Sequence, residues 1–238
     1  MIGVYYTIFK EPMEESRFAG YLDLMPDRIR SETARYGRWQ DAHACLLGKL
    51  LLQKGLEKFG YAGLSLEDLL YTPYNRPYLP APSLPTPFSG KIDFNISHSG
   101  ELVVCAISDD SQVGIDVERV DEIALADFRN IWTDKEWRDI QSPQNGLTRF
   151  YRYWTMKEAA IKADGRGLNI SLPDVILERD KATIDGATWT LRELFLHPSY
   201  VAHLSFDRPS AVSPDRPSPV SPDRPSPESI EINCLLFN

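Results

Sequence analysis

The sequence is poor in cysteine and has no paired cysteine motif. Its 238 residues contain three cysteines, Cys45, Cys105 and Cys234, which lie far apart and form no CxxC. Cys45 and Cys105 stand in apolar runs, so we expect them to be reduced residues of the core. Reduced cysteines in turn indicate a reducing compartment.

The sequence also lacks an excess of positive charge. Lysine and arginine number 26 against 34 aspartate and glutamate residues, which gives a formal net charge of -8. Because nucleic-acid phosphates require a basic surface, this balance argues against a general nucleic-acid binder. It leaves room for a local basic pocket that holds one phosphorylated ligand.

Long apolar segments are absent as well. No stretch approaches the ~20 consecutive apolar residues of a membrane span. The opening MIGVYYTIFKEP has no basic region followed by a long apolar core, so it does not resemble a signal peptide. With 42% hydrophobic and 25% charged residues, the composition is typical of a soluble globular protein. We therefore expect a cytoplasmic, monomeric protein with neither membrane nor nucleic-acid partners.

Hydrophobic periodicity predicts a mixture of long helices and short strands. Residues 39–59 place apolar side chains on one side of a helix, and Gly60 marks its end. Residues 101–108, ELVVCAIS, are apolar at successive positions, as in a strand buried on both faces. Thr133 and Glu136 have the spacing of a capping box, which predicts the start of another helix. Strands are also expected at residues 4–9, 92–96, 113–120, 172–178, 187–194, 200–206 and 229–237.

Three copies of an eight-residue unit begin at Asp207, reading DRPSAVSP, DRPSPVSP and DRPSPESI. Units this short do not build a solenoid. They have little to bury, and their prolines cannot join a sheet ladder, so we predict an extended, disordered loop over residues 207–228. On this interpretation the segments 200–206 and 230–237 pair as a hairpin, with the repeat as its loop.

The stretch VGIDVERV places two acids side by side on one face of a strand. Its apolar side chains at 113, 115 and 117 face one way, and Asp116 and Glu118 face the other, with Gly114 leaving space beside them. One interpretation is a face that meets water. The other is a divalent-cation site, because Mg²⁺ takes one or two carboxylates and completes its octahedron with water and substrate phosphate.

The stretch WTMKEAAIK places an acid in the apolar row of a helix. With 3.6 residues per turn, Trp154 and Ile161 fall on one face, and Glu158 occupies the position between them. A buried carboxylate without a partner is costly. Either the helix is rotated and Glu158 pairs with Lys162 at the surface, or Glu158 faces a metal shared with the two acids of the strand and Lys162 reaches a phosphate.

Two further groups of polar residues leave similar alternatives. In FNISHSG, His98 is expected in a tight turn, either as an exposed bystander or, with Ser97, Ser99 and Gly100, in a donor cluster for an anion. Four arginines either cover a solvated helix face or give the chain a local basic patch. These are Arg28, Arg30, Arg35 and Arg38.

Taken together, these stretches resemble a known family. In chain order, NISHSG, GIDVE and WTMKEAAIKADGRGL are similar to the three signature motifs of the Sfp-type 4'-phosphopantetheinyl transferases. NRPYL resembles a shorter motif that precedes them in the family, and DAHACLLGKLLL resembles the family's first long helix. The resemblance covers about residues 20–205, and the third signature motif is its most specific part.

The resemblance implies an α/β (α+β) fold of two similar lobes in a pseudo-twofold arrangement. Each lobe would be a small, mainly antiparallel sheet packed with a long helix, with the active site between the lobes, which we place at residues 1–111 and 112–238. It implies an enzyme that moves the 4'-phosphopantetheine group of coenzyme A to a serine of an acyl or peptidyl carrier protein, releasing adenosine 3',5'-bisphosphate. Mg²⁺ would be the cofactor. The apolar segment 123–137 is expected to dock the carrier protein.

Matching motif to motif also implies roles for single residues. Asp116, Glu118 and Glu158 would hold the magnesium ion. Lys162 and His98 would contact phosphate and, with Glu158, make up the catalytic residues. Contacts with coenzyme A are expected from Arg28, Arg30, Arg76, Pro77, Ser97, His98, Lys157 and Lys162.

Some positions depart from the family pattern or leave alternatives. Ala44 stands where some members carry an arginine, for which Arg35 or Arg38 could compensate. Arg76 stands where lysine is frequent and retains the charge. Lys157 either assists the reaction or faces solvent. Two other functions remain open: a non-catalytic relative that binds coenzyme A or a carrier protein, and a magnesium-dependent phosphodiesterase that cleaves coenzyme A with water.

Overall fold

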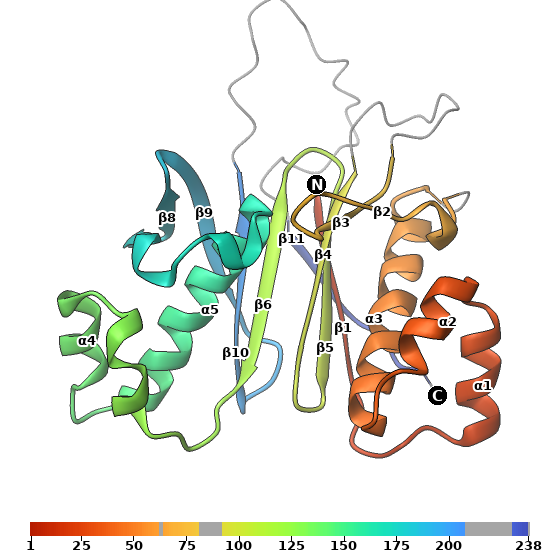
Figure 1. Ribbon diagram of the computed structural model, residues 1–238, viewed down its shortest axis with the longest axis horizontal. Helices are drawn as coiled ribbons and strands as arrows, with labels where there is room; N and C mark the ends of the chain where they lie inside the picture. The colour runs from red at the N-terminus through yellow and green to blue at the C-terminus, as the bar shows by residue number, and fades with distance from the viewer. Residues whose placement is uncertain (62–63, 81–91, 208–229, 238) are drawn as a thin grey trace, which may run out of the picture.

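The fold has two halves, each built from one sheet and one long helix, which meet along the edges of their sheets (Figure 1). The computed structural model describes residues 1–61, 64–80, 92–207 and 230–237. Apart from its first and last residues, Asp207 and Ile230, the octapeptide repeat lies outside these ranges, so its disorder stays a prediction. Within them, no helix combines the length and the apolar character needed to cross a membrane.

The first half is a four-stranded sheet covered on one face by helices. Its strand order is β11 (Ile230–Cys234), β1 (Ile2–Ile8), β5 (Leu102–Ser108) and β4 (Asp93–Ser99). Helix α3 (Trp39–Lys58) packs on the sheet, and α1 (Glu15–Asp23) and α2 (Asp27–Thr33) lie beyond it (Figure 1). Gly60, with φ 81°, follows the end of α3, as predicted. A 3₁₀ turn (Leu66–Asp68) and the short strands β2 (Leu70–Tyr71) and β3 (Pro77–Tyr78) precede β4.

Strand β5 is buried on both faces, as its uninterrupted apolar sequence predicted. One set of its alternate side chains, which includes Cys105, belongs to the core under α3. The other set, which includes Leu102, packs with Ile115 and other apolar residues of the second half. The two halves therefore share a core along this strand. Cys105 is buried as expected, whereas Cys45 is only half-buried.

The second half is a five-stranded antiparallel sheet with helix α5 (Gly146–Asp164) packed on it. The strand order is β6 (Val113–Arg119), β10 (Tyr200–Phe206), β9 (Ala187–Leu194), β8 (Lys181–Ile184) and β7 (Ile176–Glu178). Helix α4 (Asp134–Ile140) begins with the predicted capping box of Thr133 and Glu136. The strand expected at 172–178 is shorter than predicted, because Leu172–Asp174 forms a 3₁₀ turn that contains a proline.

The last strand does not pair as the sequence suggested. The predicted hairpin between 200–206 and 230–237 is wrong: β11 pairs with β1 in parallel, with Ile2 opposite Ile230. The reason is that β10 already has β6 on one edge and β9 on the other, so neither edge is free for a further strand. Residues 230–234 therefore lie in the sheet of the first half, although the expected boundaries placed them in the second lobe.

Helix α5 lies unusually close to strand β6, and Gly114 allows this approach. A Cβ atom at Gly114 would lie 2.2 Å from the carbonyl oxygen of Ala159 and 2.3 Å from the backbone nitrogen of Ala163. Both neighbours are helix backbone, which cannot rotate away as a side chain could. The contact brings the residues of WTMKEAAIK beside the acids of VGIDVERV.

We expect Gly114→Ala to lower the free energy of unfolding by about 1–3 kcal/mol, because the added methyl group must push α5 from the strand. Urea denaturation measures the change. Gly20→Ala is the matched control: a Cβ atom there meets nothing within 4 Å, and alanine favours the helix by about 0.5–1 kcal/mol. Equal stability of the wild type and Gly114→Ala would contradict the close contact.

Candidate active site

The candidate site lies at the seam between the two sheets, where β4 is the end strand of one and β6 the end strand of the other. Polar side chains of β4 bind β6 across this seam, and α5 lies against β6. The side chains gathered there are Ser97 and Ser99 from β4, Asp116 and Glu118 from β6, and Glu158 and Lys162 from α5.

Asp116 is a buried acid, with 3% of the residue exposed. Its Oδ1 accepts hydrogen bonds from Lys162 Nζ at 2.6 Å and from Ser97 Oγ at 3.1 Å. Its Oδ2 is buried and has no hydrogen-bond partner. Burial raises the pKa of Asp116, and the Lys162 ammonium opposes that shift. Oδ2 of Asp116 can therefore coordinate a cation or accept a hydrogen bond.

Glu118 and Glu158 are half-buried acids that add negative charge beside Asp116. Burial raises the pKa of Glu118 to about 7, and the charges of Asp116 and Glu158 add to the shift. Burial and then the charge of Asp116 raise the pKa of Glu158. Ser99 Oγ donates to Glu118 Oε2 at 2.7 Å. The interpretation of VGIDVERV as a strand with a water-facing acidic side is wrong, because these acids face the seam.

Lys162 reaches across from α5 to β6 rather than along its own helix. Its ammonium pairs with Asp116 and also donates to Ser97 Oγ at 3.0 Å, and its side chain is 28% exposed. The surface pair of Glu158 with Lys162, which the sequence had left open, is replaced by this contact. Lys162 therefore carries a positive charge into the seam and keeps access to solvent.

The donor chemistry of the acids fits a hard divalent cation. Three neighbouring carboxylates disfavour one another's charge, and one of their oxygens has no partner. Carboxylate oxygens are the ligands that Mg²⁺ prefers. Within the described part of the chain, no three acid, imidazole or thiol groups are already arranged to hold a metal ion. The metal roles of Asp116, Glu118 and Glu158 therefore stay a prediction.

The structure changes the expected places of His98 and Ser97. Strand β4 continues through Ser99, and the turn follows at Gly100 (φ 53°), so His98 lies in the strand and not in the turn. His98 is exposed, and the protein atoms that partly desolvate its ring, followed by the charge of Lys162, lower its pKa. Ser97 is buried and forms hydrogen bonds with Asp116 and Lys162, and its expected contact with phosphate stays a prediction.

One residue that adjoins the site was not indicated by any sequence pattern. His203 lies opposite Asp116 in the register of β10 and β6. Its Nδ1 lies 2.8 Å from Thr155 Oγ1 of α5, and both residues are buried. Burial lowers the pKa of His203 to about 4, so the ring is neutral at neutral pH. It joins α5 to the sheet next to the acids; nothing in YVAHLSF alone indicated this contact.

Two family models match the chain in succession. Residues 11–110 match the model described as 4'-phosphopantetheinyl transferase, N-terminal, and residues 112–212 match the 4'-phosphopantetheinyl transferase superfamily. The chain belongs to the 4'-phosphopantetheinyl transferase superfamily. The resemblance of the motifs is thereby confirmed, and so is the predicted α/β fold of two sheet-plus-helix halves.

Curated relatives carry the same description. A 4'-phosphopantetheinyl transferase of Bacillus subtilis is 34% identical over 148 residues, which are 60% of this chain and 61% of the relative. The 4'-phosphopantetheinyl transferase Sfp of Bacillus subtilis (strain 168) is 28% identical over 71% of this chain and 73% of the relative. The L-aminoadipate-semialdehyde dehydrogenase-phosphopantetheinyl transferase of Xenopus laevis is 30% identical over 66% of this chain and 60% of the relative. The chain thus spans about three fifths of the first and the third of these relatives.

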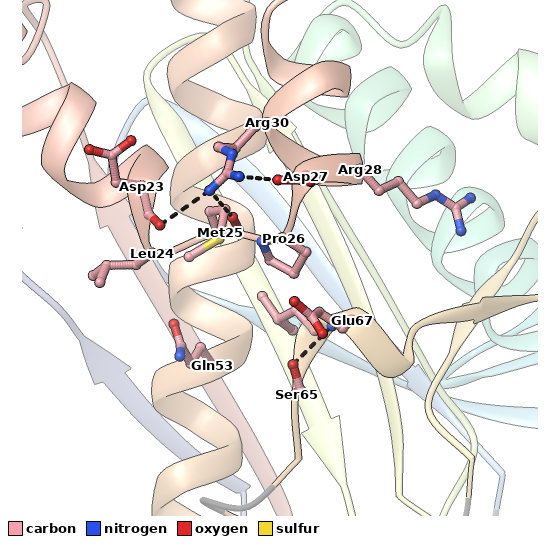
Figure 2. A pocket seen from close by; sticks show the side chains of 11 residues that line it. Asp23, Leu24, Met25, Pro26, Asp27, Arg28, Arg30, Gln53, Ser65 and Glu67 are labelled. Atoms are coloured by element: carbon pink, nitrogen blue, oxygen red, sulfur yellow. Dashed lines mark hydrogen bonds and ion pairs between the residues drawn. The ribbon is translucent and has the colours of Figure 1, made fainter.

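Two basic residues of the expected coenzyme A site point in different directions. Figure 2 shows Arg30 of α2 directed toward the connection from α1, where it donates to the carbonyl oxygens of Asp23 and Met25 and pairs with Asp27. Arg28 extends the other way, and its guanidinium lies 4.1 Å from the centre of the Tyr71 ring. Both line a cavity of about 490 Å³ that includes none of the six seam residues. Arg30 therefore supports the loop between α1 and α2, whereas the contact of Arg28 with coenzyme A stays a prediction.

Arg76 is part of the protein interior between the halves. Its guanidinium binds Asp93 of β4 at 2.6 Å, the carbonyl oxygen of Val113 in β6 at 2.9 Å and that of Ala163 in α5 at 3.3 Å. The resemblance implied a contact with coenzyme A. In the structure the side chain of Arg76 joins β4, β6 and α5. Pro77 follows in β3 and is half-buried.

Lys157 does not face solvent, which was one of the two alternatives for it, and its contact with coenzyme A stays a prediction. Its side chain is fully buried, pairs with Glu136 at 2.9 Å and donates to the carbonyl oxygen of Leu172 at 2.9 Å. Burial lowers the pKa of Lys157, and the bond to Glu136 opposes the shift. This lysine therefore holds α5 to α4 in the interior.

The expected docking face at 123–137 turns largely inward. Trp132 is buried, and Phe128 packs on Phe150 and Trp154 of α5 with ring centres 5.1 and 6.2 Å apart. The apolar side chains of this segment fill the second half beside α5. Phe128 and Trp132 are thus covered by aromatic residues of α5 rather than turned out as a free apolar face.

Proposed function

We propose that this protein transfers the 4'-phosphopantetheine group of coenzyme A to a serine of an acyl or peptidyl carrier protein and releases adenosine 3',5'-bisphosphate. The observation that supports this function best is the cluster of Asp116, Glu118 and Glu158 beside Lys162 at the seam, with Asp116 Oδ2 unpartnered. The cluster is supplied by the same motifs that match the superfamily. Relatives that bear the name of this activity support the proposal further.

The acids suit the charge of the reaction. Phosphoryl transfer from coenzyme A spreads negative charge over the pyrophosphate, and a magnesium ion, when bound, neutralises part of it. Asp116, Glu118 and Glu158 would hold that ion through carboxylate oxygens. Burial raises the pKa of Glu118 to about 7, and repulsion from Asp116 and Glu158 adds to the shift. A cation held by the three acids would remove that repulsion.

Lys162 and the remaining polar residues act on the substrate. The Lys162 ammonium binds oxygens of the phosphate, since it is a partly exposed point charge within the seam. His98, exposed in β4 and with a lowered pKa, donates one ring N–H as a neutral imidazole. The Glu158 carboxylate, which lies beside Asp116 in the cluster, accepts the proton of the attacking serine hydroxyl.

Intact-mass spectrometry of an apo carrier protein tests the proposal. The protein is incubated with coenzyme A, Mg²⁺ and a panel of fatty-acid, polyketide and nonribosomal-peptide carriers. We expect at least one carrier to gain the mass of phosphopantetheine, and the same carrier with alanine at the attachment serine to gain none. Cleavage of coenzyme A without modification of any carrier would favour the phosphodiesterase. Binding of coenzyme A without either change would favour the non-catalytic relative.

A further inference from the structure

A ladder of side-chain hydrogen bonds crosses the seam between the two sheets. Alternate side chains of β4 accept the backbone N–H of alternate residues of β6. The pairs are Asp93 with Val113 (2.8 Å), Asn95 with Ile115 (2.9 Å), Ser97 with Val117 (3.4 Å) and Ser99 with Arg119 (3.0 Å). Because β6 is the end strand of its sheet, these bonds satisfy N–H groups that lack a neighbouring strand.

The two serines of the ladder each make a second hydrogen bond. Its acceptor is the acid one position before the β6 residue whose backbone N–H the serine binds. Ser97 Oγ lies 3.1 Å from Asp116 Oδ1, and Ser99 Oγ lies 2.7 Å from Glu118 Oε2. A backbone N–H can only donate, and an ionised carboxylate can only accept. Each hydroxyl therefore accepts from the backbone and directs its single proton to the carboxylate.

The same assignment holds with Lys162 included. Its ammonium can only donate, so Ser97 accepts from Lys162 and from the backbone of Val117 and still has its proton for Asp116. With Ser97 and Lys162 both on Oδ1, the other oxygen of Asp116 is the one without a partner. The bonds thus select which carboxylate oxygen is free.

We propose that Ser97 and Ser99 are positioning residues that hold one oxygen of Asp116 and of Glu118 toward β4 and so direct the other oxygen of each to a divalent cation. The inference rests on the proposed function, because it concerns the same site. Ser99 has the larger role of the two. Glu118 is only half-buried and has one more rotatable bond than Asp116, so more conformational freedom is removed when one oxygen is held.

The chain offers a matched control within the same ladder. Asn95 accepts the N–H of Ile115 as Ser99 accepts that of Arg119. The residue that precedes Ile115 is Gly114, which has no side chain for Asn95 to hold. Asn95→Ala and Ser99→Ala therefore each remove one bond across the seam, but only the second also releases an acid.

The test is a titration with Mn²⁺ followed by electron paramagnetic resonance. It uses the full-length wild-type protein, Ser99→Ala, Ser99→Thr and Asn95→Ala, first with Mn²⁺ alone and then with coenzyme A added. No carrier protein is present, so turnover does not contribute to the signal. Thermal melts of every variant are recorded beside the titrations. If Ser99→Ala does not fold, Ser97→Ala makes the same comparison at Asp116.

We expect Ser99→Ala to bind Mn²⁺ about tenfold more weakly than the wild type, which is typical when an outer partner of a metal ligand is lost. Ser99→Thr, which keeps the hydroxyl, and Asn95→Ala should bind as the wild type does. The proposal is overturned if Ser99→Ala binds Mn²⁺ as tightly as the wild type, or if Asn95→Ala weakens binding as much as Ser99→Ala does. It is also overturned if the wild type shows no saturable binding of Mn²⁺ in either titration. The expected order of affinities without modification of any carrier would overturn the proposed transfer instead.

Discussion

Asp116→Asn is expected to reduce the proposed phosphopantetheine transfer by at least about 100-fold. Stabilisation of phosphate charge by a metal ion is worth several kcal/mol, and each ~1.4 kcal/mol corresponds to a factor of ten in rate. An amide at position 116 removes one negative charge from the cluster and places an N–H donor where the seam needs acceptors. Excess Mg²⁺ should not restore the rate. The measurement is the initial rate of carrier modification against Mg²⁺ concentration.

The protein should stay folded when Asp116 is changed. Lys162, its ionic partner, is 28% exposed, so the ammonium keeps contact with water after the pair is lost. Asp121→Asn is the control, because it makes the same change of acid to amide at an exposed residue shortly after β6. If Asp116→Asn modifies the carrier at a rate near that of the wild type, the unpartnered oxygen has no part in the reaction.

Lys157→Met should lower the free energy of unfolding by about 3–5 kcal/mol. The substitution removes the cation from a buried pair and leaves the Glu136 carboxylate, with 6% of the residue exposed, without its charge partner. Methionine has similar length, so the loss is electrostatic rather than a cavity. Urea denaturation of the wild type and the variant measures the difference.

The double change of Glu136→Gln and Lys157→Met should recover most of that stability. Glutamine keeps the part of the capping box at the start of α4 that Glu136 supplies, and no buried charge remains. Affinity of the double variant for coenzyme A, measured by calorimetry, should equal that of the wild type. A stable Lys157→Met variant that binds coenzyme A weakly would mean that this lysine contacts the ligand after all.

Local patterns of the sequence were sufficient to predict most elements and the centre of the candidate site. The capping box at Thr133, the end of α3 before Gly60 and the doubly buried β5 depend on neighbouring residues alone. The period of a strand put Asp116 and Glu118 on one face, and the period of a helix put Glu158 in line with Trp154. Such periods are properties of a short stretch and need no knowledge of its surroundings.

Strand β4 carries a regular pattern of polar residues. Polar side chains occur at every second position, Asp93, Asn95, Ser97 and Ser99. The alternation shows that these side chains share one face of the strand. That they bind the edge of β6 could not be inferred, because the edge belongs to the other sheet.

What only the tertiary structure decided is the identity of each partner. Strand β11 joins β1 because both edges of β10 are taken, and edge availability is a property of the finished sheet. Lys157 and Arg76 were predicted as contacts of coenzyme A, with solvent as the alternative for Lys157. Each is bound to an acid distant in sequence, Glu136 and Asp93. A buried charge persists only where the fold supplies such a partner, and the sequence near that charge does not name it. The side-chain periods therefore determined which groups share a face, and the packing of the two halves determined what each face meets.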